Sequence, residues 1–315
     1  MALLEIENLS VSFRDAEGAV VEAAKGVTLS LGRGEVLGMV GESGSGKSSV
    51  AMSVPRLLPS PPAFWPEGRV VFDGMDVLRL GEKELRSIRG RRIGVVFQDP
   101  IGSLSPLHRI GAQLEETVLL HRDVSRAAAR EAAVEWLGRV GIPDPAARAS
   151  AYPHELSGGM QQRVMIAMAL MLGPDLLIAD EPTTALDVTV QAQILALVRK
   201  LRGADSAVLL ISHDLGVVSQ MATKIAVMKD GLVVEKSDDP AGFFAGPRSD
   251  YAKTLLREAR KMEFRPKIPP CARGGIFGII RRCKPERTVN KVAAYHTSGA
   301  FPAGRATATA ISGQQ

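Results

Sequence analysis

Residues 35–50 read Glu-Val-Leu-Gly-Met-Val-Gly-Glu-Ser-Gly-Ser-Gly-Lys-Ser-Ser-Val, and this stretch decides the fold class of the chain. Its apolar run, Val36 to Val40, predicts a short buried strand, and the residues after Gly46 can start a helix. From Gly41 to Ser48 the sequence fits the pattern G-x-x-x-x-G-K-[ST] of a phosphate-binding loop. The alternative is a Gly- and Ser-rich turn that matches by chance, but the strand before the loop and the helix after it favour a nucleoside triphosphate site.

The chemistry of phosphate binding explains the residue types in this loop. Glycines allow backbone angles that other residues avoid, so that successive N–H groups can converge on one anion. Lys47 can reach the β- and γ-phosphates, the Ser48 hydroxyl can bind Mg²⁺, and the start of the following helix adds partial positive charge. The loop residues that we expect to bind the nucleoside triphosphate are Gly41, Glu42, Ser43, Gly44, Ser45, Gly46, Lys47, Ser48 and Ser49.

The distribution of charge separates the body of the chain from its C-terminal end. The chain has 315 residues, 45% of them hydrophobic, which is enough to bury a full core. From Arg257 to the end there are 12 Lys/Arg and 3 Asp/Glu, which leaves 27 basic and 31 acidic residues in the rest. A mildly acidic body argues against a nucleic-acid-binding core, so we expect no nucleic-acid partner. Residues 259–315 predict a basic tail without a fold, although such a tail could touch acidic lipid headgroups.

Apolar runs in this sequence are too short to predict a membrane span. The closest run, Val164 to Ala179, is interrupted by Gly-Pro-Asp at 173–175. The N-terminus carries Glu5 and Glu7 and lacks a basic-then-apolar signal, so we expect the protein to stay in the cytoplasm unless a partner brings it to a membrane.

Strands that alternate with helices predict an α/β fold with a mostly parallel, covered core sheet. The opening segments, residues 3–13 and 19–31, suit an antiparallel β subdomain, and residues 101–165 have the spacing of a helical subdomain inserted into the body. Residues 224–236 predict a hairpin that turns at Asp230-Gly231.

A second buried strand, Leu176 to Ala179, ends in two carboxylates. Asp180 at the strand end can hold the hydration shell of Mg²⁺, and Glu181 can polarise a water for in-line attack on the γ-phosphate. Adjacent carboxylates also occur as ordinary surface charge. Their place behind a buried strand, downstream of a phosphate loop, favours catalysis.

The stretch from Leu156 to Gln162 reads Leu-Ser-Gly-Gly-Met-Gln-Gln and can open a helix whose bare N–H groups hold an anion. The alternative is the Gly-rich start of a structural helix. The stretch resembles the LSGGQ signature of ATP-binding-cassette (ABC) ATPases, with Met160 where Gln is commonest. The resemblance covers Met1 to about Glu258 and implies a P-loop NTPase domain in which residues 157–159, Ser157, Gly158 and Gly159, also bind ATP.

Further motifs fit the same family. Gln98 resembles the Q-loop glutamine, which implies contact with Mg²⁺ or water and communication with a membrane partner. The segment 185–187 resembles the D-loop, whose Asp187 would contact nucleotide, and His213 resembles the switch histidine at the γ-phosphate. Phe13 matches the aromatic that stacks on adenine, although a core phenylalanine is the fair alternative. The resemblance thus implies that Glu181, His213 and Gln98 catalyse hydrolysis and that Ser48, Gln98 and Asp180 bind Mg²⁺.

The same resemblance implies an assembly. Two ATP molecules would lie between two subunits arranged head to tail, each phosphate loop facing the signature of the other subunit, and closure would drive a transmembrane permease. This chain has one such domain, so its partner is a second copy or a paralogue. An extracytoplasmic substrate-binding protein would take part indirectly, and the chain would lie peripherally on the cytoplasmic face of the membrane.

Within the family, several stretches resemble the ATPases of oligopeptide, dipeptide and nickel importers. They are residues 97–105 (Phe-Gln-Asp-Pro-Ile-Gly-Ser-Leu-Ser), the lead into the signature at 152–156, and the segment 180–193. Pro247, Tyr251 and Leu255-Leu256 resemble a Pro-Tyr-Thr-x-x-Leu-Leu segment of these proteins, although Asp250 and Ala252 depart from it. We therefore expect an ATPase subunit for peptide uptake, with a nickel or metal-complex importer as the alternative.

Two more distant alternatives are a soluble ABC ATPase acting on DNA or ribosomes and a subunit that binds ATP without hydrolysing it. The first usually carries two cassettes or long coiled-coil insertions, and the second would lack Lys47, Glu181 or His213, all of which are present. Peptide-importer ATPases often end in a cysteine-rich segment that can hold an iron–sulphur cluster. Here the tail keeps only Cys271 and Cys283, so we expect no cluster.

Overall fold

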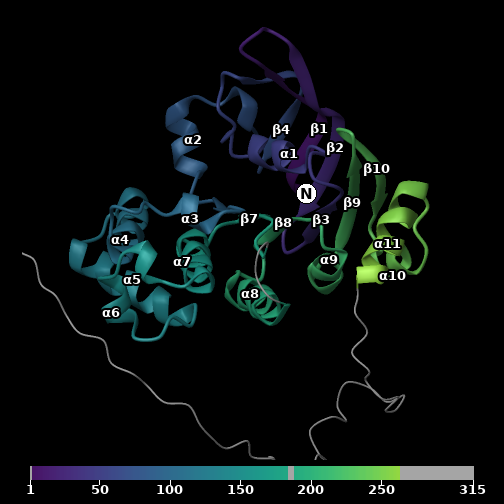
Figure 1. The fold of residues 1–315 in the computed structure, drawn as a ribbon. Coiled ribbons are helices and arrows are strands. Elements are labelled where there is room, and N and C mark those ends of the chain that lie inside the picture. Colours follow the sequence, from purple (N-terminus) through teal and green to yellow (C-terminus); the bar gives the residue numbers. More distant parts are fainter. Residues whose placement is uncertain (1, 184–187, 263–315) are drawn as a thin grey trace, which may run out of the picture. The chain divides into compact units, whose positions relative to one another are not determined.

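The computed structural model describes residues 2–183 and 188–262, which form two β-sheets covered by helices (Figure 1). The four-stranded antiparallel sheet has the order β2-β1-β4-β5, and the six-stranded sheet has the order β10-β9-β3-β8-β7-β6. The first contains β1 (Ala2–Arg14), β2 (Val20–Gly32), β4 (Ala63–Phe72) and β5 (Met75–Asp76). The second contains β3 (Val36–Val40), β6 (Ile93–Val96), β7 (Leu176–Asp180), β8 (Ala207–Ser212), β9 (Lys224–Lys229) and β10 (Leu232–Ser237).

The six-stranded sheet confirms the predicted α/β class, because its strands pair in parallel except for the hairpin of β9 and β10. That hairpin turns at Asp230 and Gly231, both with positive φ, as the sequence predicts. All residues of β3, β7 and β8 are buried, which explains why these strands read as unbroken apolar runs.

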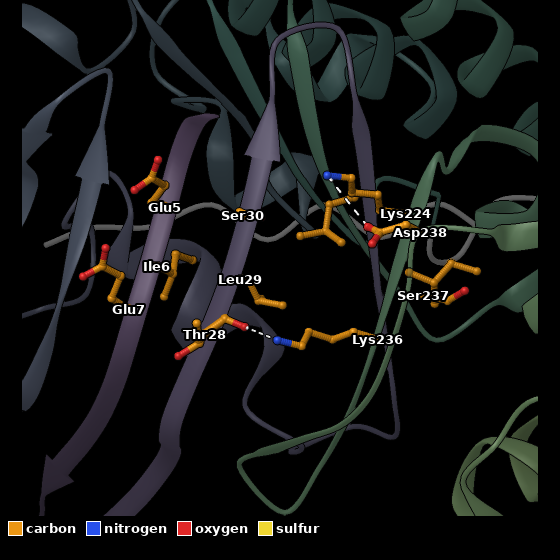
Figure 2. A pocket seen from close by; sticks show the side chains of 12 residues that line it. Glu5, Ile6, Glu7, Thr28, Leu29, Ser30, Lys224, Lys236, Ser237 and Asp238 are labelled. Atoms are coloured by element: carbon orange, nitrogen blue, oxygen red, sulfur yellow. Dashed lines mark hydrogen bonds and ion pairs between the residues drawn. The ribbon is translucent and has the colours of Figure 1, made fainter. Parts of the chain in front are cut away.

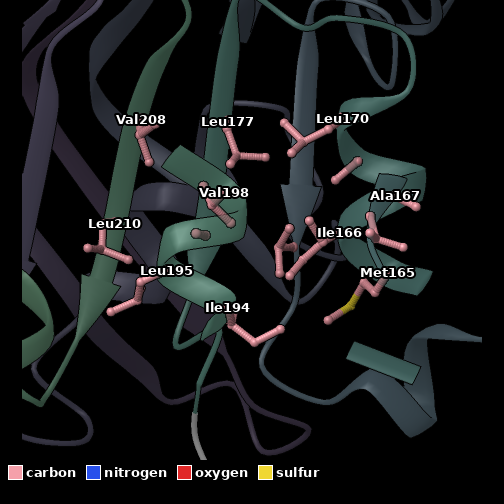
Figure 3. Packing of buried hydrophobic residues seen from close by; sticks show 14 of the residues in the cluster. Met165, Ile166, Ala167, Leu170, Leu177, Ile194, Leu195, Val198, Val208 and Leu210 are labelled. Atoms are coloured by element: carbon pink, nitrogen blue, oxygen red, sulfur yellow. The ribbon is translucent and has the colours of Figure 1, made fainter. Parts of the chain in front are cut away.

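Successive residues of the central strands face two different hydrophobic clusters. Leu177, Val208 and Leu210 pack against helices α7 (Gly158–Leu170) and α8 (Val188–Leu201), as Figure 3 shows. Residues one position along, such as Ile178 and Leu209, pack with the antiparallel sheet on the other face. The period of two along each strand therefore divides the core into two layers.

The remaining helices include a group between β6 and β7, together with helices that contact central strands such as β3 and β8. Four of them lie between β6 and α7, where the sequence predicts a helical insertion: α3 (Pro100–Ser103), α4 (Ile110–His121), α5 (Arg126–Arg139) and α6 (Pro145–Ala149). The others are α1 (Lys47–Ser53), α2 (Glu82–Ile88), α9 (Leu215–Met221), α10 (Pro240–Ala245) and α11 (Asp250–Met262), with two 3₁₀ turns, η1 (Val77–Arg79) and η2 (Pro153–Glu155).

Strand β4 begins at Ala63, directly after a proline-rich segment, and runs through Pro66. Over residues 63–70 the strand pairs with β1 alone, and β5 joins its other edge only at Val71 and Phe72. Because an edge strand does not need every N–H for pairing, it accommodates the proline.

Four charged side chains join the two sheets at one end. Asp73, after β4, lies 3.1 Å from Arg33 and 2.6 Å from Arg92, measured from carboxylate oxygen to guanidinium nitrogen. Asp175, before β7, lies 3.4 Å and 2.7 Å from the same two arginines. Each charge thus has two partners of opposite sign, and the hydrogen bond from Arg92 lowers the pKa of Asp73.

Some sequence predictions fall outside the described residues. The segment 185–187 with Asp187, the region 263–315 of the tail, and both cysteines are among them. Helix α11 itself extends to Met262, beyond the domain end expected near Glu258. Among the helices in residues 2–183 and 188–262, none is long and apolar enough to cross a membrane.

Candidate functional site

The predicted phosphate loop joins β3 to α1 and is closely packed on its underside. Gly41 and Gly46 have φ values of +155° and +96°. A Cβ atom at Gly41 would lie 2.2 Å from the carbonyl oxygen of Met228, and one at Gly46 would lie 2.0 Å from that of Ala23. Since real Cβ atoms do not approach so closely, only glycine fits at these two positions, and strands β9 and β2 shape the loop from outside.

Lys47 lies buried at the start of α1, with its ammonium turned back over the loop. Its Nζ donates hydrogen bonds to the carbonyl oxygens of Gly41 (2.8 Å) and Glu42 (2.7 Å) and to the hydroxyl of Ser45 (3.2 Å). Burial lowers the pKa of Lys47, while the negative charges of Glu181 and other acidic neighbours oppose that shift. These three acceptors hold the ammonium of Lys47 at one place over the loop.

Asp180, the last residue of β7, accepts a hydrogen bond of 2.9 Å from the Ser48 hydroxyl. Burial raises the pKa of this carboxyl group, and the bond from Ser48 opposes the rise. A hydroxyl and a carboxylate side by side are oxygen ligands of the kind Mg²⁺ prefers when nucleotide phosphates and water supply the rest. The side chains present thus fit the predicted metal site.

Glu181 lies at the centre of a group of three polar side chains. Its Oε2 atom accepts a hydrogen bond from Gln98 Nε2 (3.2 Å) and lies 3.1 Å from His213 Nδ1. Its backbone has a φ of +45°, unusual for a residue with a side chain, and its N–H donates to the carbonyl of Ile211 at 3.0 Å. Gln98, Glu181 and His213 follow β6, β7 and β8, so the carboxyl ends of three parallel strands bring them together.

A cavity of about 590 Å³ unites most of the predicted residues. Its lining includes ten of them: Glu42, Ser43, Gly44, Gly46, Lys47, Ser48, Ser49, Gln98, Glu181 and His213. Gly41 and Ser45 lie in the phosphate loop and Asp180 ends β7. Each of the three is next in sequence to a residue that lines the cavity. Sequence reasoning missed Ala23 of β2, which completes the lining. Nothing in the local pattern of β2 marks this alanine, because only the packing of the antiparallel sheet brings it there.

Phe13 does not line this cavity. It lies in β1, pairs with Val21 and Ala63, and is partly buried against the cluster beneath the antiparallel sheet. Its contact with adenine stays a prediction.

The signature stretch also lies apart from this cavity. Ser157 caps α7, with its hydroxyl accepting a hydrogen bond from the N–H of Met160 at 3.4 Å. Gly158 is exposed, and outside its own helix no heavy atom of the described residues lies within 4 Å of a Cβ built on it. Gln161 Nε2 donates to the carbonyls of Pro153 (2.8 Å) and Leu156 (3.1 Å), which fixes the turn ahead of the helix. The helix thus presents its N-terminus at the surface.

Two glutamines that the sequence analysis did not single out hold the strand ends. Gln162 of α7 donates to the carbonyl of Pro182 at 2.7 Å. Gln191 of α8 donates to the hydroxyl of Thr183 (3.0 Å) and to Asp214 (3.2 Å). These bonds reach residues next to Glu181 and His213 from two different helices. The sequence signals were that Gln162 ends the signature stretch and that Gln191 falls in the stretch 180–193 that resembles importer ATPases.

Another cavity, of about 350 Å³, lies between β1, β2 and the hairpin of β9 and β10 (Figure 2). Its cations are already engaged: Lys224 lies 3.8 Å from Asp238, and Lys236 donates to the carbonyl of Thr28 at 3.2 Å. We assign no chemistry to this cavity.

Comparisons with known proteins agree with the geometry. A family model described as "ABC transporter" matches residues 24–184. The chain is 47% identical to the oligopeptide transport ATP-binding protein OppD of Bacillus subtilis, covering 83% of this chain and 73% of the relative. It is 48% identical to the dipeptide transport ATP-binding protein DppD of Escherichia coli, covering 82% and 78%. A dimeric structure of the ATP-binding cassette MJ0796, in a post-hydrolysis state bound to ADP and Pi, matches with a TM-score of 0.66 at 31% identity, covering 74% of this chain and 97% of that one.

Proposed function

This chain belongs to the ABC transporter family, and from that premise we propose that it is the ATP-hydrolysing subunit of an importer that carries peptides across the cytoplasmic membrane. The observation that carries the proposal is the contact of Glu181 with both Gln98 and His213, in the cavity that Lys47 and Ser48 also line or border. The names of the relatives support peptides as the cargo.

The proposed mechanism assigns each group a role. The loop N–H groups and the Lys47 ammonium orient the β- and γ-phosphates, since they are in place before the nucleotide arrives. Mg²⁺, held by Ser48 and Asp180 with Gln98 nearby, would neutralise developing charge on the phosphates. Glu181 accepts the proton of the attacking water, and the contacts to His213 and Gln98 hold its Oε2 towards the cavity.

We propose that the second half of the ATP site comes from another ABC subunit arranged head to tail. Packing among residues 2–183 and 188–262 does not explain Gly158, because no side chain or neighbouring element of that part of the chain lies within 4 Å of a Cβ built on it. An exposed helix N-terminus capped by Ser157 suits an anion that a facing subunit presents. The dimeric state named for the MJ0796 structure supports the pairing of two such subunits.

A groove beside Gln98 suits the permease subunit. Its volume is about 220 Å³, and mostly apolar residues of β6, α7 and their neighbours line it. Phe97, directly before Gln98, and Leu57 are 39% and 40% exposed there. Exposed apolar surface marks an interaction site. A permease segment in this groove would touch Phe97, which directly precedes Gln98, and Gln98 contacts Glu181. The permease would hold the chain at the cytoplasmic face, and an extracytoplasmic binding protein would deliver the cargo.

The decisive experiment measures ATP turnover by the purified chain, alone and with its permease subunits, beside Glu181→Gln. We expect turnover that rises with the permease and is lost in the variant. ATP binding without turnover in every mixture would instead indicate a subunit that does not hydrolyse ATP.

The cargo needs a separate measurement. Cells that lack this chain should lose uptake of a labelled dipeptide and recover it with the wild-type gene, while nickel uptake stays unchanged. Loss of nickel uptake alone would favour the metal-importer alternative.

A further inference from the structure

Helix α11 lies beyond the residues that the family model matches, yet it contacts the phosphate loop. The hydroxyl of Tyr251, in the first turn of α11, accepts a hydrogen bond of 3.1 Å from the backbone N–H of Glu42. These two residues are 209 positions apart in the sequence. A contact of this range indicates that the end of the described chain takes part in shaping the loop.

The start of α11 is itself held firmly. Glu235 of β10 accepts hydrogen bonds from the backbone N–H groups of Arg248 and Ser249, both at 2.8 Å. Ala252 is completely buried, and Leu256 packs in the same core cluster. With backbone and core contacts on both sides, the ring of Tyr251 has a defined place.

The ring of Tyr251 also contacts a cation from the neighbouring hairpin. Lys229 Nζ of β9 lies 5.0 Å from the centroid of the ring. Such a contact over the ring face is attractive, so it helps to hold the ring beside the loop.

Tyr251 and Lys47 bind the two ends of one peptide group, the one between Gly41 and Glu42. The carbonyl of Gly41 and the N–H of Glu42 belong to the same planar peptide group and point in opposite directions. Lys47 donates to the carbonyl end at 2.8 Å, and Tyr251 accepts from the N–H end at 3.1 Å. Rotation of this peptide would break both bonds, so the hydroxyl of Tyr251 opposes any rotation that would release the Lys47 ammonium.

We propose that Tyr251 is a positioning residue for ATP binding, which fixes the Gly41–Glu42 peptide and through it the ammonium of Lys47. The C-terminal helix thereby sets the affinity of the phosphate loop for nucleotide. The inference rests on the proposed ATP site and is independent of the cargo.

The test compares Tyr251→Phe with wild type for affinity towards a fluorescent ATP analogue and for steady-state turnover. A net hydrogen bond is worth about 0.5–1.5 kcal/mol, so we expect the Kd and the KM for ATP to rise about 2- to 10-fold. The kcat should stay near that of wild type, because Tyr251 touches none of the residues around Glu181. If Tyr251→Phe leaves both the Kd and the KM unchanged, the proposal is overturned.

Two control variants isolate the hydroxyl. Tyr152→Phe removes a hydroxyl from the ring that stacks on His154, and Lys229→Met removes the cation over the Tyr251 ring but keeps the hydrogen bond to Glu42. Tyr152→Phe should bind ATP as wild type does, and Lys229→Met should lose less affinity than Tyr251→Phe because the hydrogen bond to Glu42 remains. An affinity loss in Lys229→Met as large as in Tyr251→Phe would assign the effect to ring packing and overturn the role of the hydroxyl.

Amide hydrogen exchange separates positioning from general stability. In Tyr251→Phe the exchange of the Glu42 amide should accelerate while the Tm stays close to the wild-type value. A lower Tm with unchanged exchange at Glu42 would show a merely structural contact. Because binding to the wild-type chain is measured directly, failure of the proposed ATPase function would appear as absent turnover or binding in wild type, before any variant is compared.

Discussion

The phosphate loop and the signature stretch differ in how closely other elements of this chain pack around their glycines. Around the loop, strands on both sides approach Gly41 and Gly46 within about 2.2 Å of a would-be Cβ, and Lys47 has three hydrogen-bond acceptors. Around Gly158, the described part of the chain places no heavy atom from outside the helix within 4 Å of a would-be Cβ. Both stretches are rich in glycine. Gly41 and Gly46 of the loop are required by the packing of this chain, whereas no packing among the described residues requires Gly158 of the signature.

The difference shows that the role of a glycine-rich motif follows from the contacts around its glycines and not from its sequence alone. Intrachain contacts require glycine at Gly46, whereas Gly158 lies at an exposed helix N-terminus where a partner could approach.

Lys47→Ala disrupts the phosphate loop and should have the largest effect. Loss of the charge that faces the phosphates should weaken ATP binding and turnover by about 100-fold or more. Equilibrium binding and phosphate release measure it. The exposed Lys83→Ala, which removes the same charge from α2, should behave as wild type. Tight ATP binding by Lys47→Ala would remove the lysine from the site.

Glu181→Gln sharpens the comparison because it should stop ATP hydrolysis without disturbing the phosphate loop or the signature stretch. Turnover should fall by about 100- to 10,000-fold, because the amide cannot accept the proton of water. ATP binding should persist, and size-exclusion chromatography with ATP should detect an accumulated dimer. Hydrolysis at the wild-type rate would contradict the assignment of Glu181 as the base.

Gly158→Val and Gly46→Val test the comparison directly. Gly158→Val should keep the wild-type Tm and bind ATP, but lose ATP-dependent dimerisation and about tenfold in turnover, since contacts at a helix N-terminus are worth up to about 2 kcal/mol. Gly46→Val should instead lower stability by about 1–3 kcal/mol, because its side chain would collide with Ala23. Equal Tm losses in the two variants would show that both glycines serve intrachain packing.

Asp73→Asn lies away from both halves and should have the smallest effect. The hydrogen bond from Arg92 lowers the pKa of Asp73 below its unfolded value of 3.8, so the stability it contributes is present above that value and is lost as the pH falls through the folded-state pKa. At pH 7 the change should cost about 0.2–1 kcal/mol, less in high salt. Urea unfolding between pH 3 and 7 measures it, with the exposed Asp123→Asn as control. A loss that persists unchanged at pH 3 would exclude the ion pairs as its cause.

The sequence by itself determined the parts that depend on neighbours along the chain. The phosphate loop, the strand that ends at Asp180 and the hairpin at Asp230-Gly231 follow from residue spacing, from buried apolar runs and from backbone angles that glycine permits. Because the loop and the carboxylates follow buried strands, their place at one edge of the sheet could also be predicted. The ABC family resemblance rested on these same local stretches.

Tertiary structure alone decided the features that join distant segments. Strand β4 continues through Pro66 because its edge is free there, and the seven-residue helices α2 and α9 are too short to leave a clear period in the sequence. The convergence of Gln98 and His213 on one oxygen of Glu181, and the bond between Tyr251 and Glu42, depend on how strands and helices pack. Local patterns carry the preferences of single residues, whereas these contacts exist only once burial of the core has selected one arrangement of the elements.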